Sequence, residues 1–415
     1  MSADDLKTTP LNAWHRANNA NMAGFGGYDM PLWYGSGVKK EHLAVLESAG
    51  LFDTSHMACV MVKGTDALEL LQFCITRELS DLKNGRCAYG AILNDKGHVV
   101  DDAIVYRFGQ GSFMVCVNAG MGDKVSDHLG ANKGRMNLEI ENLSDRLAKI
   151  DIQGRNSARI LSKLLKTPDS VFTAMPYFSF KGSLHHGGAD PVLLKDGTNI
   201  LLSRSGYTGE FGFEIFADSG AGVSIWEQLL NAGREYNLTP CGLAARDSLR
   251  VGSVLPLSHQ DIGNMPYINH PWMVALPLDQ DGKTFTKDFL GRDALEAAND
   301  ADFTHAFVGE DLRKVGSGPD TQVIDAKGKM IGSVLTCVTD MGIGWHDGKI
   351  YSITSPDLPV DFKAKGISCG FILADHKLEE GEKLTLQEGK RKIKVTVVKD
   401  IRPHRTAKLK LTNFI

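Results

Sequence analysis

The spacing of the hydrophobic residues changes at residues 296–304 (EAANDADFT). Before this segment, helical spacing and strand-like alternation follow one another along the chain. After it, short alternating stretches are separated by turns that contain Gly and Asp, with almost no helical spacing. Evenly spaced short strands are typical of a small β-barrel or sandwich. We therefore predict an α+β body over residues 1–300 and a C-terminal β-barrel domain over residues 301–415.

The composition excludes several classes of protein. Hydrophobic residues make up 42% and charged residues 23% of the chain, which is typical of a globular protein. No apolar run approaches the ~20 residues that a membrane-spanning helix needs. The net charge of −4 provides no overall basic field for nucleic acid. We expect neither a membrane nor a nucleic acid as partner.

The sequence contains no motif typical of a metal site or of a redox-active cysteine pair. The seven cysteines include no CxxC pair, and the histidines are scattered, so we expect no metal site. His185 and His186 lie in a turn that glycines flank, which we interpret as a surface loop. The N-terminal segment has two early aspartates and no apolar core, so we expect no targeting sequence and a cytoplasmic location.

Two adjacent aspartates interrupt an apolar strand, HVVDDAIVY (98–106). Because side chains alternate along a strand, we expect Asp102 on one face with Val100 and Tyr106, and Asp101 on the other face. A carboxylate among apolar side chains has a raised pKa and is a candidate acid, base or stabiliser of a cation. A strand-end aspartate that caps a turn is the alternative.

A second carboxylate follows a tight turn in SRSGYTGEFGFE (203–214). Alternation places Phe211 and Phe213 on one face of the strand and Glu214 on the other, beside Gly212. The small glycine would let a flat ligand approach, and a planar amidine-like edge can pair with one carboxylate through two parallel hydrogen bonds. A solvated glutamate is the alternative.

A pair of arginines lies in GLAARDSLR (242–250), which we predict to be helical. Arg246 and Arg250 are four residues apart and so share one face of the helix. Such a pair can orient a buried carboxylate or receive the anionic end of a substrate. A surface helix with ion pairs is the alternative.

Seven segments that occur in this order resemble the aminomethyltransferase (T-protein) family of the glycine cleavage system and its folate-dependent relatives. They are FGGYDMP (25–31), AGLFDTSHM (49–57), YGAILNDKGHVVDDAIVY (89–106), NA (118–119), SRSGYTGEFGFE (203–214), GLAARDSLR (242–250) and DFLGRDAL (288–295). The resemblance implies a three-domain cloverleaf around a central folate channel. Two intertwined α+β subdomains would form the body, and the β-barrel would come last.

The resemblance also implies the roles of single residues. Asp102 matches the catalytic aspartate of the family, and Glu214 matches the carboxylate that holds the pterin. The other residues that match the folate cavity are Tyr89, Tyr106, Asn118, Tyr207 and Arg246. The implied activity moves the methylene of an aminomethyl-lipoyl carrier, an H-protein-like partner, to tetrahydrofolate, with release of ammonia.

The chain departs from the pattern of the family at several positions, including Tyr28, Ala58, residues 250–253 and residues 401–407. Two departing segments, 267–272 (YINHPW) and 336–345 (TCVTDMGIGW), bear on the donor. They lie where a carbon donor or a partner protein is expected. A tetrahydrofolate-dependent demethylase of an N-, O- or S-methylated small molecule is therefore the alternative enzyme. A non-catalytic folate-binding accessory protein is a third possibility, against which the presence of Asp102 counts. A basic stretch over residues 390–410 could steer an acidic partner or could only keep an edge strand soluble.

Overall fold

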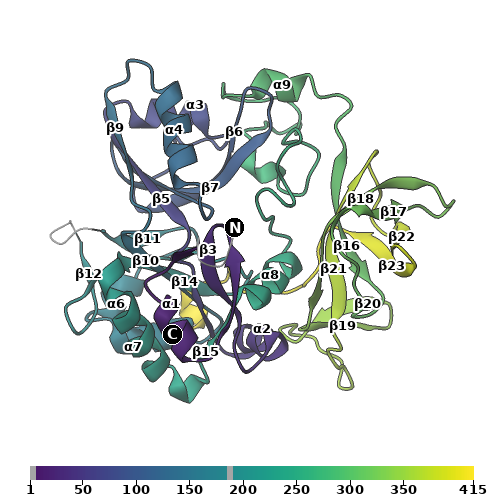
Figure 1. Ribbon diagram of the computed structural model, residues 1–415. Coiled ribbons are helices and arrows are strands. Elements are labelled where there is room, and N and C mark those ends of the chain that lie inside the picture. The colour runs from purple at the N-terminus through teal and green to yellow at the C-terminus, as the bar shows by residue number, and fades with distance from the viewer. Residues whose placement is uncertain (1–5, 185–189) are drawn as a thin grey trace.

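The computed structural model describes residues 6–184 and 190–415 and shows three lobes (Figure 1). Two lobes combine helices with open sheets, and the third is a closed barrel of six strands. The predicted α+β class with a C-terminal β-barrel is thus confirmed. The loop that we predicted at His185 and His186 lies outside the described residues.

The first α+β lobe is built on a five-stranded antiparallel sheet in the order β6-β7-β8-β5-β9. One face of the sheet buries Val60, Val105 and Val115 against helices α3 and α4. The other face carries Cys87, Tyr106 and Cys116. The elements are β5 (Ala58–Gly64), α3 (Ala67–Cys74), β6 (Arg86–Leu93), β7 (Val99–Gly109), β8 (Ser112–Val117), α4 (Gly122–Asn132) and β9 (Leu138–Asn142).

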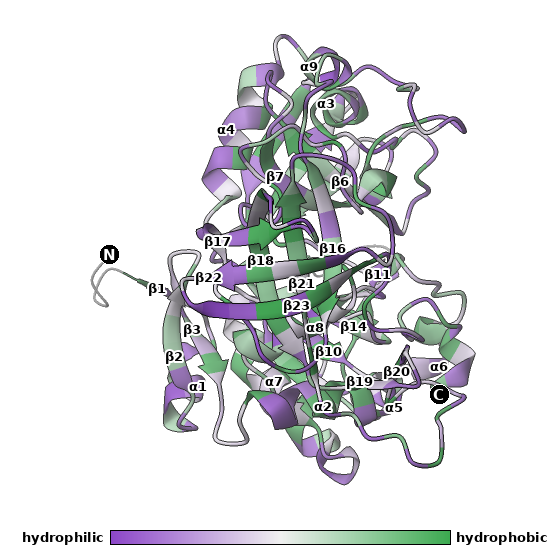
Figure 2. Cartoon of the chain, turned by 90° about the vertical axis from the view of Figure 1, so that its right-hand side faces the viewer, coloured by the Kyte–Doolittle hydropathy of each residue, from purple (hydrophilic) through white to green (hydrophobic). Residues whose placement is uncertain are grey.

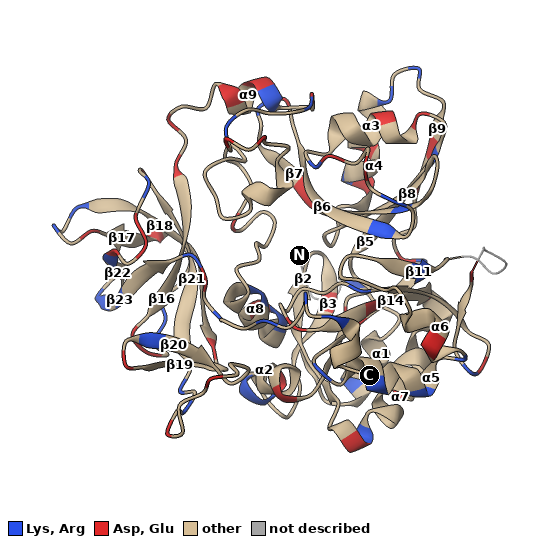
Figure 3. Cartoon of the chain, turned by 180° about the vertical axis from the view of Figure 1, so that it is seen from behind, with Lys and Arg blue, Asp and Glu red and all other residues tan. Residues whose placement is uncertain are grey.

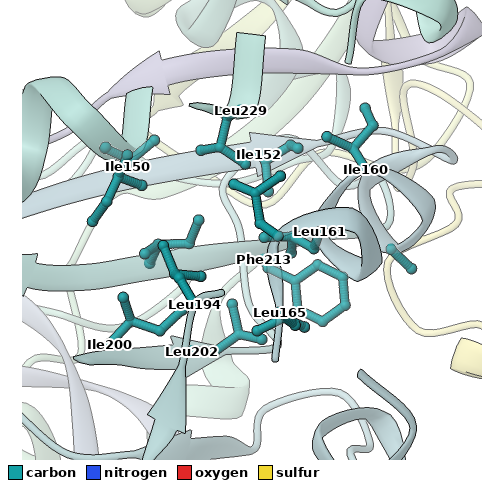
Figure 4. Close-up of a cluster of buried hydrophobic side chains, with 14 of the residues drawn as sticks. Ile150, Ile152, Ile160, Leu161, Leu165, Leu194, Ile200, Leu202, Phe213 and Leu229 are labelled. Atoms are coloured by element: carbon teal, nitrogen blue, oxygen red, sulfur yellow. The ribbon is translucent and has the colours of Figure 1, made fainter. Parts of the chain in front are cut away.

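The second α+β lobe is built on a seven-stranded sheet in the order β11-β13-β14-β10-β4-β15, with β12 paired to β13. Figure 4 shows its core, where Ile150 and Ile152 pack against Leu161 and Leu229 from two helices. The elements are β4 (Gly50–Asp53), β10 (Leu147–Gln153), α5 (Ser157–Leu164), α6 (Pro168–Phe172), β11 (Phe180–Gly182), β12 (Val192–Leu193), β13 (Asn199–Ser203), β14 (Gly212–Asp218), α7 (Gly222–Ala232) and β15 (Thr239–Pro240).

The N-terminal residues and helix α8 complete this second lobe. They comprise β1 (Lys7–Thr8), α1 (Asn12–Ala17), β2 (Asn21–Phe25), β3 (Tyr28–Trp33), α2 (Val38–Glu47) and α8 (Leu243–Gly252). The chain therefore runs through β4 of the second lobe, crosses to the first lobe, and returns at β10. The chain thus connects the two lobes twice, between β4 and β5 and between β9 and β10. Side chains from both lobes surround the space between them.

The barrel has the strand order β16-β21-β18-β17-β22-β23. Alternate residues fill its interior, as Ile393, Val395 and Val397 do on β23, while Lys392 and Lys394 point outward and are exposed. Figure 2 shows this strand turning from purple to green along its length. The strands are β16 (Phe303–Gly309), β17 (Gly318–Ile324), β18 (Met330–Asp340), β21 (Ile367–Ala374), β22 (Lys383–Glu388) and β23 (Arg391–Val398), with a hairpin of β19 (Ile343–His346) and β20 (Lys349–Ser352) and with α9 (Arg292–Glu296) before them.

The end of the chain does not stay with the barrel. After β23, residues 401–415 return to the second lobe, where the ring of Phe414 stacks on that of Phe211 with centroids 4.0 Å apart. Arg204 donates hydrogen bonds to the carbonyls of Ala407 and Leu409, each at 2.9 Å. The residues that we assigned to the barrel domain thus include a tail that is part of the core of the body.

Barrel and body also share a hydrophobic cluster. Val251 and Trp272 of the body pack there with Ala306 and Phe371 of the barrel, so the third lobe is held firmly in place. None of the described helices is long and apolar enough to cross a membrane.

Candidate active site

A cavity of about 1220 Å³ lies between the two α+β lobes. Its lining residues come from both lobes, from the segment 255–274 and from the C-terminal tail. Figure 3 shows acidic positions on β7 and basic positions on α8. The cavity-lining residues that we predicted from the sequence are Tyr89, Asp102, Asn118, Tyr207, Glu214 and Arg246.

Asp102 faces the cavity from β7. Tyr89 donates a hydrogen bond to its Oδ2 at 2.9 Å, and the Nδ2 of Asn118 donates one to its Oδ1 at 2.6 Å. Both bonds favour the ionised carboxylate, but burial and the negative charge of Asp101 outweigh them and raise the pKa of Asp102 to about 7. Asp102 can therefore gain or lose a proton near neutral pH.

One detail of the predicted alternation is wrong. Val100 does not share a face with Asp102 but packs with Ala103 and Val105 on the opposite side of the sheet. The pairing of β6 with β7 shifts between Ile92 and Leu93, so that Val100 is an extra residue in the strand. Such a β-bulge turns the side chains that follow it and is common beside active sites.

Tyr106 does not line the cavity. It is completely buried, and its hydroxyl donates a hydrogen bond to Glu214 at 3.3 Å. Tyr106 thus supports the wall from behind and does not lie at the surface of the cavity, where the resemblance placed it.

Glu214 is buried at the wall of the cavity, with 4% of its surface exposed. The Nζ of Lys149 contacts one carboxylate oxygen, and the hydroxyl of Ser205 donates to the other. A solvated strand glutamate is therefore excluded. Because Lys149 supplies the compensating charge, the carboxylate is a stable acceptor inside the protein.

The space beside Gly212 is not open to a ligand, contrary to our expectation. The side-chain amide of Gln153 occupies it, and a Cβ on Gly212 would lie 2.8 Å from that amide. Gln153 donates hydrogen bonds to the carbonyls of Ser205 and Phe213, both at 3.2 Å. The glycine therefore serves the packing of the turn and does not admit a ligand to Glu214 from that side.

Arg246 continues the buried chain of charges. Its Nη1 donates to Asp151 at 2.8 Å, and Lys149 donates to the other oxygen of Asp151, also at 2.8 Å. Despite burial, these two cations hold the pKa of Asp151 below its usual value. The guanidinium of Arg246 lies 4.9 Å from the centre of the Tyr207 ring. This cation–π contact helps to hold the two side chains together.

Arg250 also lines the cavity, but carboxylates hold it in place. It donates to Asp247 at 2.8 Å and contacts Asp261. Asp261 in turn accepts a hydrogen bond at 2.6 Å from Thr336 of the barrel. Helix α8 thus presents Arg246 to the cavity and uses Arg250 to fix the segment 255–262.

Lys149 and Asp151 were not predicted as site residues. Both lie on β10, where the sequence LAKIDIQ alternates apolar with polar residues, and every residue from 148 to 153 is buried. Such alternation predicts a strand with one solvated face. In the structure this polar face is buried, with Glu214 beside it. The alternation of polar residues was visible in the sequence, but it predicted that they face solvent.

His56 is another residue that the sequence did not single out. It lines the cavity with 4% exposure, and its Nδ1 has no hydrogen-bond partner among the described residues. Burial lowers its pKa to about 4, so it is a neutral imidazole at physiological pH. Within residues 6–184 and 190–415, no group of three or more His, Cys, Asp or Glu side chains could hold a metal ion.

Known proteins are similar to this chain in sequence and in architecture. The GCVT N-terminal domain family matches residues 11–268. The aminomethyltransferase of Caldanaerobacter subterraneus subsp. tengcongensis is 35% identical over 339 residues, which cover 81% of this chain and 85% of that protein. The aminomethyltransferase of Koribacter versatilis is 36% identical over 335 residues, which cover 80% and 84%.

The solved structure of the glycine cleavage system aminomethyltransferase T from Bartonella henselae is similar over nearly the whole chain. The TM-score is 0.75 at 26% identity, and the match covers 95% of this chain and 97% of that one. This chain belongs to the aminomethyltransferase family, the T-protein family of the glycine cleavage system.

Proposed function

We propose that this chain uses tetrahydrofolate as acceptor and takes the methylene from an aminomethyl group on the lipoyl arm of an H-protein-like carrier, with release of ammonia. The size of the cavity is the observation that carries the proposal. Its volume of about 1220 Å³ exceeds the ~300–1,000 Å³ that suits a single small ligand. An acceptor and the end of a donor arm can therefore meet inside it, and holding both reactants supplies much of the catalysis.

The polar groups of the cavity fit tetrahydrofolate. Glu214 is a buried carboxylate at the wall. Its Oε2 already accepts from Tyr106 and Ser205, whereas its Oε1, which contacts Lys149, keeps a lone pair that could accept a hydrogen bond from the amino-pyrimidine edge of a pterin. Tyr89 and Tyr207 add aromatic surface for a flat ring, and His56 offers an Nδ1 that has no hydrogen-bond partner in the described part of the chain. Tetrahydrofolate supplies a nucleophilic nitrogen when it is bound.

Asp102 is suited to manage charge at the reacting centre. Tyr89 and Asn118 each use one acceptor position of its carboxylate, which leaves further lone pairs for a group in the cavity. With a pKa of about 7, it can accept a proton from an amine or stabilise the positive charge that develops as ammonia leaves. Asn118 and Tyr89 keep the carboxylate from rotating away.

One observation favours a second candidate, demethylation of a methylated small molecule. Of the two segments that depart from the family pattern, the first reaches the cavity, because Trp272 lines it. The second does not, since Thr336 contacts Asp261, and Asp340 contacts Arg402. The wall on the donor side thus contains a residue that the resemblance does not explain.

The test offers the protein tetrahydrofolate together with either an aminomethyl-lipoyl carrier or a panel of N-, O- and S-methylated compounds. Methylenetetrahydrofolate formed only with the carrier is the expected product. Methyltetrahydrofolate formed from a methylated compound would establish the second candidate instead. Calorimetry with Glu214→Gln tests the acceptor site alone: we expect a loss of about 1.5–3 kcal/mol in tetrahydrofolate binding, which is one to two decades in Kd. Unchanged affinity would exclude Glu214 from that site.

A further inference from the structure

Asp101 touches the same side chain as Asp102, although it does not line the cavity. It is completely buried, and its Oδ1 accepts a hydrogen bond from the Nδ2 of Asn118 at 2.8 Å. The backbone N–H of Asn118 donates to the Oδ2 of Asp101 at 2.9 Å. The same Nδ2 donates its second hydrogen to Asp102 at 2.6 Å. Asp101 contributes to the raised pKa of Asp102 through its charge, but the proposed mechanism gives it no role in holding Asn118.

The local backbone explains how two successive residues reach one amide. In a regular strand, Asp101 and Asp102 would point to opposite faces. The two residues keep this alternation, because they pair regularly with Ile92 and Ala91 and the bulge lies before them. Asn118 continues β8 beyond the pair Ala103–Val117, and from there its Nδ2 reaches both carboxylates. The two carboxylates therefore share a single amide donor. Two carboxylates held this close favour retention of a proton by one of them.

We propose that Asp101 is a positioning residue that sets the pH at which Asp102 gains or loses its proton. Asp101 fixes the amide of Asn118 against Asp102 and places a second negative charge behind the cavity-facing carboxylate. The proposal depends on the proposed function only for its effect on turnover, since the protonation of Asp102 can be measured without any substrate.

Burial raises the pKa of Asp101 as well, although its hydrogen bonds from Asn118 favour the ionised form. The neighbouring histidine and tyrosines are uncharged near neutral pH. His259 places its Nε2 3.8 Å from the Oδ1 of Asp101 and is 44% exposed. Burial and the nearby Lys124 lower the pKa of His259, so its imidazole is mainly neutral at pH 7. Burial raises the pKa values of Tyr89, Tyr207 and Tyr267, which therefore stay uncharged near Asp102.

The direct test follows the side-chain carboxyl signals of ¹³C-labelled aspartate by NMR as the ligand-free protein is titrated. The signal of Asp102 is the one that disappears in Asp102→Asn. In the wild-type protein we expect its midpoint at about 7. In Asp101→Asn we expect the midpoint to fall by at least about one pH unit, because one negative neighbour has been removed. A midpoint that stays or rises in folded Asp101→Asn would overturn the proposal.

A second pair of variants keeps the buried network intact. His259→Lys puts a permanent cation beside Asp101 and should lower the midpoint of Asp102 in the same direction. His259→Asn is the neutral control, and asparagine tolerates the φ of 65° at this position. The proposal requires a shift in the lysine variant and none in the asparagine variant. Equal midpoints in the two variants would contradict it.

The pH dependence of turnover distinguishes a positioning role of Asp101 from a purely structural one, because loss of a structural role would not shift that dependence. The acidic limb of kcat against pH should shift to lower pH in Asp101→Asn together with the NMR midpoint. A lower kcat with an unshifted limb would mean that Asp101 only supports the fold. If the wild-type protein transfers no aminomethyl group, the proposed function fails, whereas the NMR titration still decides the relationship between the two aspartates.

Discussion

Lys149 of β10 reaches across the sheet to the carboxylate of Glu214 on β14, and both side chains are almost completely buried. The cross-strand neighbour of Glu214 is Asp151, which Lys149 also contacts. One lysine therefore contacts two carboxylates, Glu214 at the wall of the cavity and Asp151 behind it. Arg246 contacts Asp151 from the other side and supplies the second positive charge. The cavity-lining carboxylate of Glu214 is held in place by a network that belongs to the folded body.

Removal of Lys149 should therefore destabilise the protein strongly. We expect Lys149→Met to cost about 3–5 kcal/mol in the free energy of unfolding, because it leaves buried carboxylates without their partner. Adding Glu214→Gln should recover part of the loss, with a coupling above about 1 kcal/mol. Urea denaturation of both single variants and the double variant measures this. Additivity of the two changes would show that the pair is not coupled.

The raised pKa of Asp102 has a consequence for stability. The folded protein retains a proton up to about pH 7, whereas the unfolded chain loses it near ~3.9. The free energy of unfolding contributed by Asp102 therefore falls as the pH rises between these values, by at most ~1.4 kcal/mol per pH unit. Asp102→Asn should gain thermal stability relative to wild type at pH 8, and this gain should vanish near pH 4.

Asp145 provides the control of opposite sign for this experiment. Hydrogen bonds from Tyr28 and Lys7 outweigh the effect of burial and lower its pKa. Asp145→Asn should therefore lose stability relative to wild type at neutral pH, and the loss should shrink as the pH falls. A wild-type Tm for Asp102→Asn at every pH would show that Asp102 has an ordinary pKa.

The C-terminal tail should contribute to the stability of the body. Phe414 is 6% exposed in the core of the second lobe, so Phe414→Ala should cost about 3–5 kcal/mol. Ile415 is 59% exposed, and Ile415→Ala should stay within about 0.5 kcal/mol of wild type. Thermal unfolding compares the two. Similar Tm values for both variants would mean that the tail is not part of the core.

The exposed lysines of β23 should affect association with an acidic carrier. We expect Lys392→Glu with Lys394→Glu to slow binding at low salt, and the difference to shrink as the ionic strength passes about 0.1 M. Lys39→Glu with Lys40→Glu on α2 is the control for net charge, since both of these residues are exposed. Stopped-flow association rates decide. Equal rates for the two double variants would leave the lysines of β23 a role in solubility only.

The sequence predicted local features better than long-range ones. The barrel was predictable because its strands alternate over short distances, and α8 because its arginines keep helical spacing. The tail was not predictable, since nothing local to Phe414 indicates that it stacks on Phe211. Tyr106 was placed at the cavity by resemblance, whereas the exact facing of its side chain depends on how β7 packs against β14.

The burial of polar residues was the hardest feature to predict. Lys149 and Asp151 follow the same alternation as a solvated strand face. The first lobe packs over this face of the sheet, where Phe216, the cross-strand neighbour of Lys149, contacts the cluster of Tyr106 and Cys116. Val100 was misplaced because a single extra residue in β7 breaks the alternation, and sequence spacing does not reveal a bulge. The environment of Lys149 and Asp151 is set by strands that are distant in the sequence, whereas the bulge at Val100 lies within the hairpin of β6 and β7.

The most direct test of the account separates the roles of Asp102 and Glu214. Turnover of the aminomethyl-lipoyl carrier and calorimetric binding of tetrahydrofolate are measured for Asp102→Asn. We predict that turnover falls by roughly a hundredfold or more, while the Kd for tetrahydrofolate stays within a few-fold of wild type. Wild-type turnover in Asp102→Asn would contradict the central claim that this carboxylate acts at the reacting centre.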